Sequence, residues 1–183
     1  PDMIRAMYDV SRQYNVGMSM HLAETNVRYQ STIDRFGKTP VGFLNDLGIL
    51  GSHLLLAHCV WLTKTDMALL SSTGSNVVYN SVSNQYLADG IADVPSLLRA
   101  GINVALGPDG AASNNNLNMF NVIKSAVLLQ RANTLDVLSL TAEQALEMAT
   151  INGAKAIGME DKIGSLEAGK KADILILNLN DGT

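Results

Sequence analysis

The sequence predicts an α/β fold in which parallel strands alternate with helices. Four short apolar segments, near residues 18, 55, 78 and 104, are each followed by residues with helical periodicity or helix-capping side chains. This alternation favours parallel pairing with right-handed crossover connections. The 183 residues are 47% hydrophobic and 16% charged, so the chain has enough apolar mass for a sizeable core and is not of the disordered class.

The first half of the chain is expected to contain two of the four strands. Ile4, Met7 and Ser11 recur at helical spacing and predict an amphipathic first helix. The unbroken apolar run over 53–59 is typical of a strand that is covered on both faces. The expected elements are a helix to about residue 15, a strand over 16–22, a helix over 25–36, a short helix over 39–48 and the strand over 53–59.

The second half is expected to continue the alternation and then to change character. Thr63 with Asp66, and Thr141 with Gln144, have the spacing of helix-capping pairs. The expected elements are a helix over 63–74, a strand over 76–79, a short helix over 95–100, a strand over 102–106, a long helix over 119–131, a helix from 141, and a turn at 164 followed by a strand.

Composition excludes several classes of protein. A single cysteine rules out a disulfide scaffold or a cysteine-rich zinc module and is compatible with a reducing compartment. A formal net charge of −4 provides no basic surface for nucleic acid or an anionic membrane. The longest apolar runs are too short to span a bilayer, and residues 1–3 do not resemble a leader peptide. We therefore expect a cytoplasmic protein with no nucleic-acid or membrane partner.

Polar side chains follow each predicted strand. His21, with Glu24 just beyond it, ends the first strand, His58 the second, Asn80 the third and Asp109 the fourth. In parallel α/β folds the functional groups gather at the carboxyl ends of the strands. Imidazole and carboxylate groups that converge there can bind a divalent metal, and a carboxylate that is not a ligand can transfer protons.

Each of these residues also has a structural interpretation. A histidine in an apolar strand is often a hydrogen-bonded core residue, which we expect of His53 and leave open for His58. Glu24 could stabilise the first turn of a helix through the macrodipole, and Asp109 could be a turn aspartate. Residues 113–116 could form a solvated loop or a helix N-cap.

Three separated segments contain these polar residues: His-Leu-Ala-Glu-Thr at 21–25, Leu-Ala-His-Cys-Val at 56–60 and Leu-Gly-Pro-Asp-Gly-Ala-Ala-Ser-Asn-Asn at 106–115. Together they resemble the amidohydrolase superfamily, in its deaminase and chlorohydrolase branch. The tail from 164 resembles the return of that family into a small β-sandwich. The resemblance implies that residues 1–163 are the C-terminal half, strands five to eight, of a metal-dependent (β/α)8 TIM barrel, and that 164–183 begin the return strand to the sandwich.

The resemblance also implies roles for individual residues. His21 and Asp109 would be metal ligands, and Asp109 would in addition accept a proton from the attacking water. Glu24 would move a proton from that water to the substrate, and His58 would contact the water or the tetrahedral intermediate. The implied cofactor is one divalent metal, with zinc ahead of iron. Substrate-binding contacts are expected from Asn80, Ser113 and Asn114.

The implied reaction is hydrolysis of a C–N bond on an amino-substituted heterocycle such as a purine, pyrimidine, pterin or triazine. A chlorohydrolase of the triazine type, and a non-catalytic half-barrel that works only by association, are the alternatives. A nucleotide-binding doubly wound domain has less support, because the sequence has neither a Gly-x-Gly-x-x-Gly nor a Walker-type loop. Pro108, next to Asp109, stands where threonine is common in the family. Because of this difference, the resemblance defines the class of reaction more firmly than it defines the substrate.

The family's metal site also requires a His-x-His pair, which this sequence does not contain. The three histidines are His21, His53 and His58, and a full barrel takes about 250 residues. The chain starts without Met, inside a predicted helix. We therefore expect a C-terminal fragment that is inactive alone and associates with a complementary N-terminal half or with itself.

Overall fold

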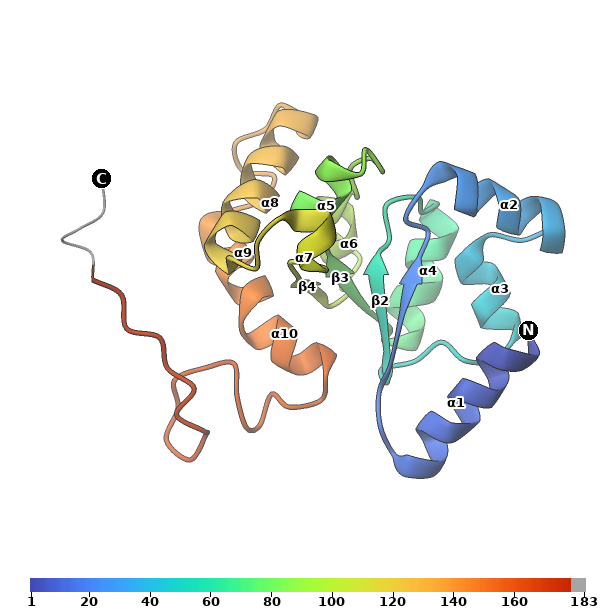
Figure 1. Cartoon of the computed structure of the whole chain (residues 1–183), viewed down its shortest axis with the longest axis horizontal. Helices are drawn as coiled ribbons and strands as arrows, with labels where there is room; N and C mark the ends of the chain where they lie inside the picture. Colours follow the sequence, from blue (N-terminus) through green and yellow to red (C-terminus); the bar gives the residue numbers. More distant parts are fainter. Residues whose placement is uncertain (179–183) are drawn as a thin grey trace.

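The computed structural model describes residues 1–178 and contains one parallel sheet of four strands (Figure 1). The strands lie in the order of the sequence, each hydrogen-bonded to the next, as the alternating pattern predicts. They are β1 (Met18–Leu22), β2 (Leu54–His58), β3 (Asn76–Tyr79) and β4 (Val104–Leu106).

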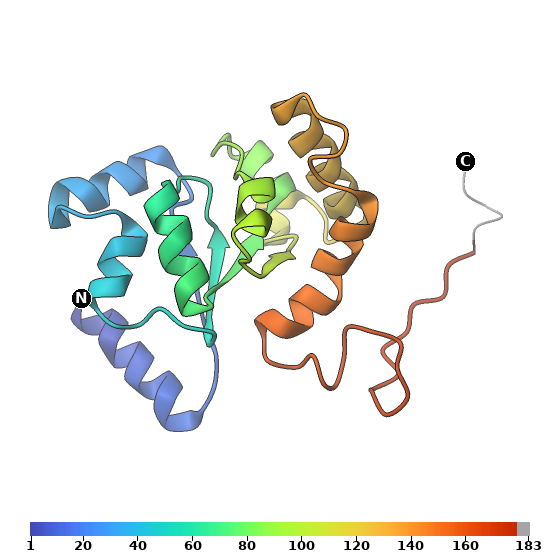
Figure 2. The same cartoon turned by 180° about the vertical axis from the view of Figure 1, so that it is seen from behind.

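Helices connect and flank the strands. In Figure 1, α1, α2 and α3 lie beside β1, while α8, α9 and α10 lie at the β4 end of the sheet; Figure 2 shows α4 in front of the sheet when it is seen from behind. The helices are α1 (Asp2–Tyr14), α2 (Asn26–Phe36), α3 (Pro40–Asp46), α4 (Lys64–Thr73), α5 (Ser81–Tyr86), α6 (Val94–Arg99), α7 (Ala111–Asn114), α8 (Met119–Thr134), α9 (Ala142–Ala149) and α10 (Ile151–Ala156).

The two faces of the sheet differ in burial. Leu54, Leu56, Val77 and Val104 are fully buried in the core. The residues between them in each strand lie on the opposite face, because side chains alternate along a strand. In register across that face lie His21, Ala57, Val78 and Ala105, of which His21 is exposed and Ala57 and Val78 are partly exposed. The face of the sheet with Leu54, Leu56, Val77 and Val104 therefore belongs to the core, and the face with His21, Ala57 and Val78 is more exposed.

The capping residues in the sequence mark real helix ends. Thr63 and Asp66 form the predicted reciprocal capping box at the start of α4, and Thr141 and Gln144 form the one at the start of α9. Gly74 ends α4 in the left-handed conformation that glycine adopts without steric cost. The single cysteine, Cys59, is buried. None of the helices within 1–178 is both long and apolar enough to cross a membrane.

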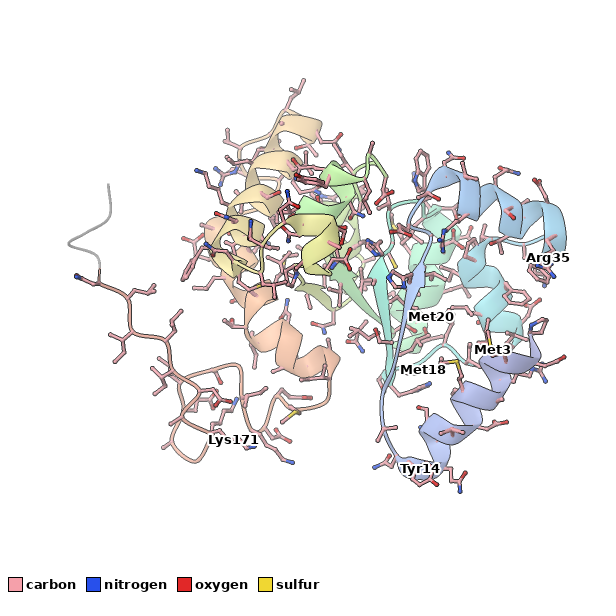
Figure 3. The ribbon with its side chains drawn as sticks, viewed as in Figure 1. Met3, Tyr14, Met18, Met20, Arg35 and Lys171 are labelled. Atoms are coloured by element: carbon pink, nitrogen blue, oxygen red, sulfur yellow. The ribbon has the colours of Figure 1, made fainter. Side chains whose placement is uncertain are left out.

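The predicted strand of the tail is not formed in the described residues. Residues 171–178 have neither helical nor strand structure, and they extend away from the sheet, with Lys171 far from the Met18 and Met20 positions of β1 (Figure 3). A strand requires a neighbour for its backbone hydrogen bonds, and none of the described strands pairs with this segment. The end of the expected strand, from 179, lies outside the described residues.

Candidate active site

The parallel strands bring the predicted site residues to one edge of the sheet. Leu22 and His58 are register partners, so His21 lies one position before the row that contains His58. Glu24 follows β1, and Asp109 lies three residues beyond the end of β4. These four side chains therefore approach one another at the carboxyl ends of the strands, where parallel α/β folds place their functional groups.

The four side chains are close in space. One ligand atom each from His21, His58 and Asp109 lies within 4.8 Å of the other two. The two imidazole rings stack with centroids 5.2 Å apart. Glu24 Oε1 lies 3.6 Å from His58 Nε2. The residues that the sequence predicted to act together are thus within reach of one small ligand.

The loops at this edge contain backbone strain. Ala23, His58 and Asp109 adopt the left-handed conformation, with φ of 48°, 74° and 60°. For residues with a Cβ this conformation costs about 1–2 kcal/mol. Such strain concentrates at functional sites, where the surrounding structure imposes it.

Asp109 accepts two short hydrogen bonds from serine hydroxyls. Ser83 Oγ donates to its Oδ2 at 2.6 Å, and Ser113 Oγ donates to the same atom at 2.8 Å. Burial acts to raise the pKa of Asp109, but these two bonds and the Gly110 backbone together lower that pKa below its ordinary value. Asp109 is therefore an ionised carboxylate at neutral pH, as a metal ligand must be.

His58 is fully buried, and burial lowers the pKa of its imidazole despite the opposing carboxylates of Glu24, Asp109 and Asp89. Its Nδ1 lies 2.9 Å from Asn84 Nδ2. Its Nε2 has no hydrogen-bond partner among the described residues. A buried polar atom without a partner is uncommon, so this nitrogen is expected to meet a ligand, water or ion in the working protein.

The donor set is compatible with a divalent metal. Neutral imidazole and carboxylate oxygen are the ligands that zinc takes in catalytic sites, and His21 and Asp109 offer one of each. Catalytic zinc sites have three or more protein ligands, so these two residues would constitute part of a site. His53 lies at the other end of β2, with its ring 5.2 Å from that of Tyr8, and has no part in it.

The three residues expected to bind substrate have partners within the protein. Asn80 is buried; its Oδ1 accepts from the His58 backbone and its Nδ2 donates to the Gly107 carbonyl, each at 3.2 Å. Asn114 Nδ2 donates to the Pro108 carbonyl at 2.6 Å, and Ser113 is the Asp109 partner described above. These contacts fix the loops that present His58 and Asp109. Direct contact of the three residues with substrate stays a prediction.

Sequence reasoning missed the partners supplied by α5. Ser83 and Asn84 contact the two central site residues, but this helix has only six residues and was not predicted. A usable signal was present: the run from Asn80 to Asn84 contains four small polar residues directly after an apolar strand. Asp89, which contacts Asn84, follows in the next turn.

The model of the amidohydrolase family matches residues 1–182. The chain belongs to this family. The observed parallel sheet and the order of the three sequence segments are those that the resemblance implied.

Relatives and solved structures narrow the comparison. A 5-methylthioadenosine/S-adenosylhomocysteine deaminase of Caldanaerobacter subterraneus is 44% identical over 98% of this chain. An adenosine deaminase from Xanthomonas campestris with bound zinc aligns over 90% of the chain with a TM-score of 0.87 and 36% identity. Atrazine chlorohydrolase from Arthrobacter aurescens TC1, in complex with zinc, aligns over 94% with a TM-score of 0.86 and 26% identity.

The chain spans only part of each of these amidohydrolases. It covers 42% of the Caldanaerobacter protein, 37% of the Xanthomonas chain and 38% of the Arthrobacter chain. More than half of each of these proteins therefore lies outside the region that matches this chain.

Proposed function

We propose that this amidohydrolase chain contributes half of the active site of a deaminase that hydrolyses the C–N bond of an amino-substituted heterocycle. The observation that supports this most strongly is the meeting of His21, Glu24, His58 and Asp109 at one edge of the sheet. Two of these residues suit metal binding, and the others suit proton transfer and hydrogen bonding.

The proposed chemistry divides among the four side chains. A divalent metal bound by His21 and Asp109 would lower the pKa of the attacking water towards neutrality. Glu24 takes a proton from that water and delivers it to the ring nitrogen of the substrate. Asp109, ionised at neutral pH, accepts the second proton, which leaves with the amino group as ammonia is released.

We further propose that β1–β4 are strands five to eight of a (β/α)8 barrel, with residues 1–163 in the barrel and 164–183 starting a small sandwich. The order β1-β2-β3-β4 and the open face next to the site support this proposal. The missing zinc ligands would then come from strands outside these 183 residues, and zinc is the proposed metal because the compared structures contain it.

The deaminase proposal takes precedence over the chlorohydrolase alternative because of sequence identity. Relatives named as deaminases of 5-methylthioadenosine or S-adenosylhomocysteine are 44% identical, whereas the compared chlorohydrolase is 26% identical. We therefore propose an adenine-containing nucleoside or nucleoside thioether as the first substrate class to examine.

The test is ammonia release from methylthioadenosine, S-adenosylhomocysteine, 5′-deoxyadenosine and guanine, with chloride release from atrazine measured in parallel. It uses the zinc-loaded complex of this chain with a co-expressed amidohydrolase segment that supplies a His-x-His pair. Glu24→Gln should lower kcat by about 100-fold or more, because the glutamine amide cannot transfer the proton. Glu143→Gln, on the exposed surface of α9, is the matched control and should leave kcat unchanged. Full turnover by Glu24→Gln, or chloride without ammonia, would contradict the proposal.

A further inference from the structure

Behind His58 lies a buried chain of two further polar side chains. Asn84 Nδ2 is 2.9 Å from His58 Nδ1 and 3.2 Å from Asp89 Oδ2. His58 and Asn84 are fully buried, and Asp89 is 5% exposed. Asn84 comes from α5 and Asp89 from the loop after it, so both reach His58 from outside the sheet. The three groups are isolated from solvent, and each must therefore be oriented by the others.

Asp89 determines which way the Asn84 amide points. A carboxylate accepts hydrogen bonds and cannot donate them, so the atom of Asn84 that faces Asp89 must be the NH2 group. The reversed amide would place a carbonyl oxygen against the carboxylate and would turn the NH2 group to the side where Asn84 Oδ1 now has no partner. The observed orientation leaves one acceptor unsatisfied, whereas the reversed one leaves two N–H donors unsatisfied and adds repulsion between oxygens.

The amide orientation in turn determines the tautomer of His58. An NH2 group 2.9 Å from Nδ1 requires a lone pair on that nitrogen, so the proton of the neutral ring is on Nε2. A ring with a proton on Nδ1, whether neutral or cationic, would face the amide donor with another donor. Nε2–H then points to the side of Glu24, whose Oε1 is 3.6 Å away, and has no closer partner among the described residues.

We propose that Asn84 and Asp89 are positioning residues that hold His58 in its Nε2–H tautomer. In this tautomer Nε2 can donate to the attacking water, the contact that the family resemblance implies for His58, and has no lone pair for a metal. The mechanistic part rests on the deaminase function proposed above, while the tautomer itself does not. Among the three clustered residues His21, His58 and Asp109, the proposal separates His58 from the metal ligands. A metal bound through Nε2 of His58 would require a lone pair on that nitrogen and therefore a proton on Nδ1. The proposal also explains the contact between Asp89 and the site without making Asp89 a ligand.

The deciding measurement is the protonation of the two ring nitrogens of His58 by long-range 15N–1H NMR, in metal-free and in zinc-loaded protein. Only three histidines are present, so a His58→Gln variant assigns the signals. We expect a bare Nδ1 and a protonated Nε2 in both samples. A proton on Nδ1 would overturn the proposal, whatever the activity.

A double variant exchanges the Asn84 amide and the Asp89 carboxylate, and so preserves the net charge and the side-chain shapes. In the double variant Asn84→Asp with Asp89→Asn, the carboxylate faces Nδ1, so the ring should be protonated on Nδ1. In the complex with the co-expressed amidohydrolase segment, we expect kcat for ammonia release to fall about 10- to 100-fold with KM within about twofold, as when hydrogen-bond partners that orient a site side chain are removed. Asp89→Asn alone replaces a group that only accepts by an amide that can also donate, so the Asn84 amide is no longer fixed and a proton on Nδ1 of His58 should become detectable. Glu143→Gln, on the exposed surface of α9, is the control and should keep both the wild-type tautomer and kcat.

The outcomes separate this inference from the proposed function. A reversed tautomer with wild-type kcat would overturn the positioning role. The expected tautomers, in a complex with the co-expressed amidohydrolase segment that binds zinc but releases no ammonia from any heterocycle, would contradict the deaminase function and leave the tautomer assignment intact. If the double variant does not fold, as judged by circular dichroism, the wild-type spectrum and Asp89→Asn still decide whether Nδ1 accepts.

Discussion

The charge of Asp109 depends on hydroxyl groups that come from two different elements. Ser83 on α5 and Ser113 on α7 donate to the same carboxylate oxygen, and both bonds stabilise the ionised form. The folded pKa of Asp109 is therefore below its unfolded value, so its ionised form contributes stability above the unfolded pKa. That contribution disappears as the pH falls through the folded pKa.

Ser83→Ala is predicted to raise the pKa of Asp109 in the metal-free protein. The variant should lose about 1 kcal/mol of unfolding free energy at pH 7, because a buried hydroxyl that bonds a carboxylate is removed. The difference should shrink as the pH falls below the ordinary range of aspartate pKa values, where Asp109 is protonated in both proteins. Urea unfolding at a series of pH values, with the carboxyl signals followed by 13C NMR, measures both effects.

Ser81→Ala is the control for Ser83→Ala. Its hydroxyl is equally buried but donates to the Val122 carbonyl, not to Asp109. This control should show a loss of stability that does not vary with pH and no change in the pKa of Asp109. An unchanged pKa in Ser83→Ala would mean that Ser113 alone is sufficient.

At the scale of single residues, the sequence was informative about residues at the carboxyl ends of strands. His21 and His58 could be predicted to approach one another because parallel register brings strand ends together. Ser83 and Asn84 could not be assigned partners, because their positions depend on how α5 turns back over the sheet edge. The positive φ of His58 is equally invisible in a sequence, since nothing in Ala-His-Cys marks a left-handed residue.

At the scale of single elements, the residues at helix ends decided which helices could be predicted from the sequence. Helices with a proline or capping pair at the start and a glycine at the end, such as α3 and α4, were predicted. The helices α5, α7 and α10 were not, because four to six residues are too few to display a 3.6-residue period. The expected strand of the tail depended on a neighbour that sequence periodicity cannot supply.

The end of α8 provides a prediction for a single element. Leu135 caps this 16-residue helix in the left-handed conformation, with φ of 54°, and its side chain is 92% exposed. Leu135→Gly should therefore raise the unfolding free energy by about 0.5–1 kcal/mol, since relief of the left-handed cost exceeds the entropy that glycine adds to the unfolded chain. Thermal and urea unfolding measure the gain.

Leu138→Gly is the matched control, because Leu138 is also exposed but is not in the left-handed conformation. It should leave stability unchanged or lower it. Equal effects of the two substitutions would indicate that removal of an exposed leucine, and not backbone conformation, is responsible.

At the scale of the molecule, the sheet leaves much of its hydrogen-bonding and apolar surface without a partner within the described residues. β1 and β4 each pair with one neighbour, and the face with His21, Ala57 and Val78 is open. Four exposed aliphatic residues also follow one another in the tail, from Ile174 to Leu177. Unpaired edges and apolar surfaces of this kind favour association, which is what the proposed place of these strands in a larger barrel requires.

The number of protein ligands that the chain offers to zinc predicts how well the isolated polypeptide binds the metal. His21 and Asp109 supply two protein ligands where catalytic zinc has three or more, so the 183-residue polypeptide alone should retain zinc poorly on dialysis and release no ammonia. Asp109→Asn should reduce the retained zinc further, whereas Glu143→Gln should not. Co-expression with an amidohydrolase segment that supplies a His-x-His pair should raise both zinc content and turnover. One tightly bound zinc per chain, with turnover by the polypeptide alone, would show instead that these four strands make a complete site.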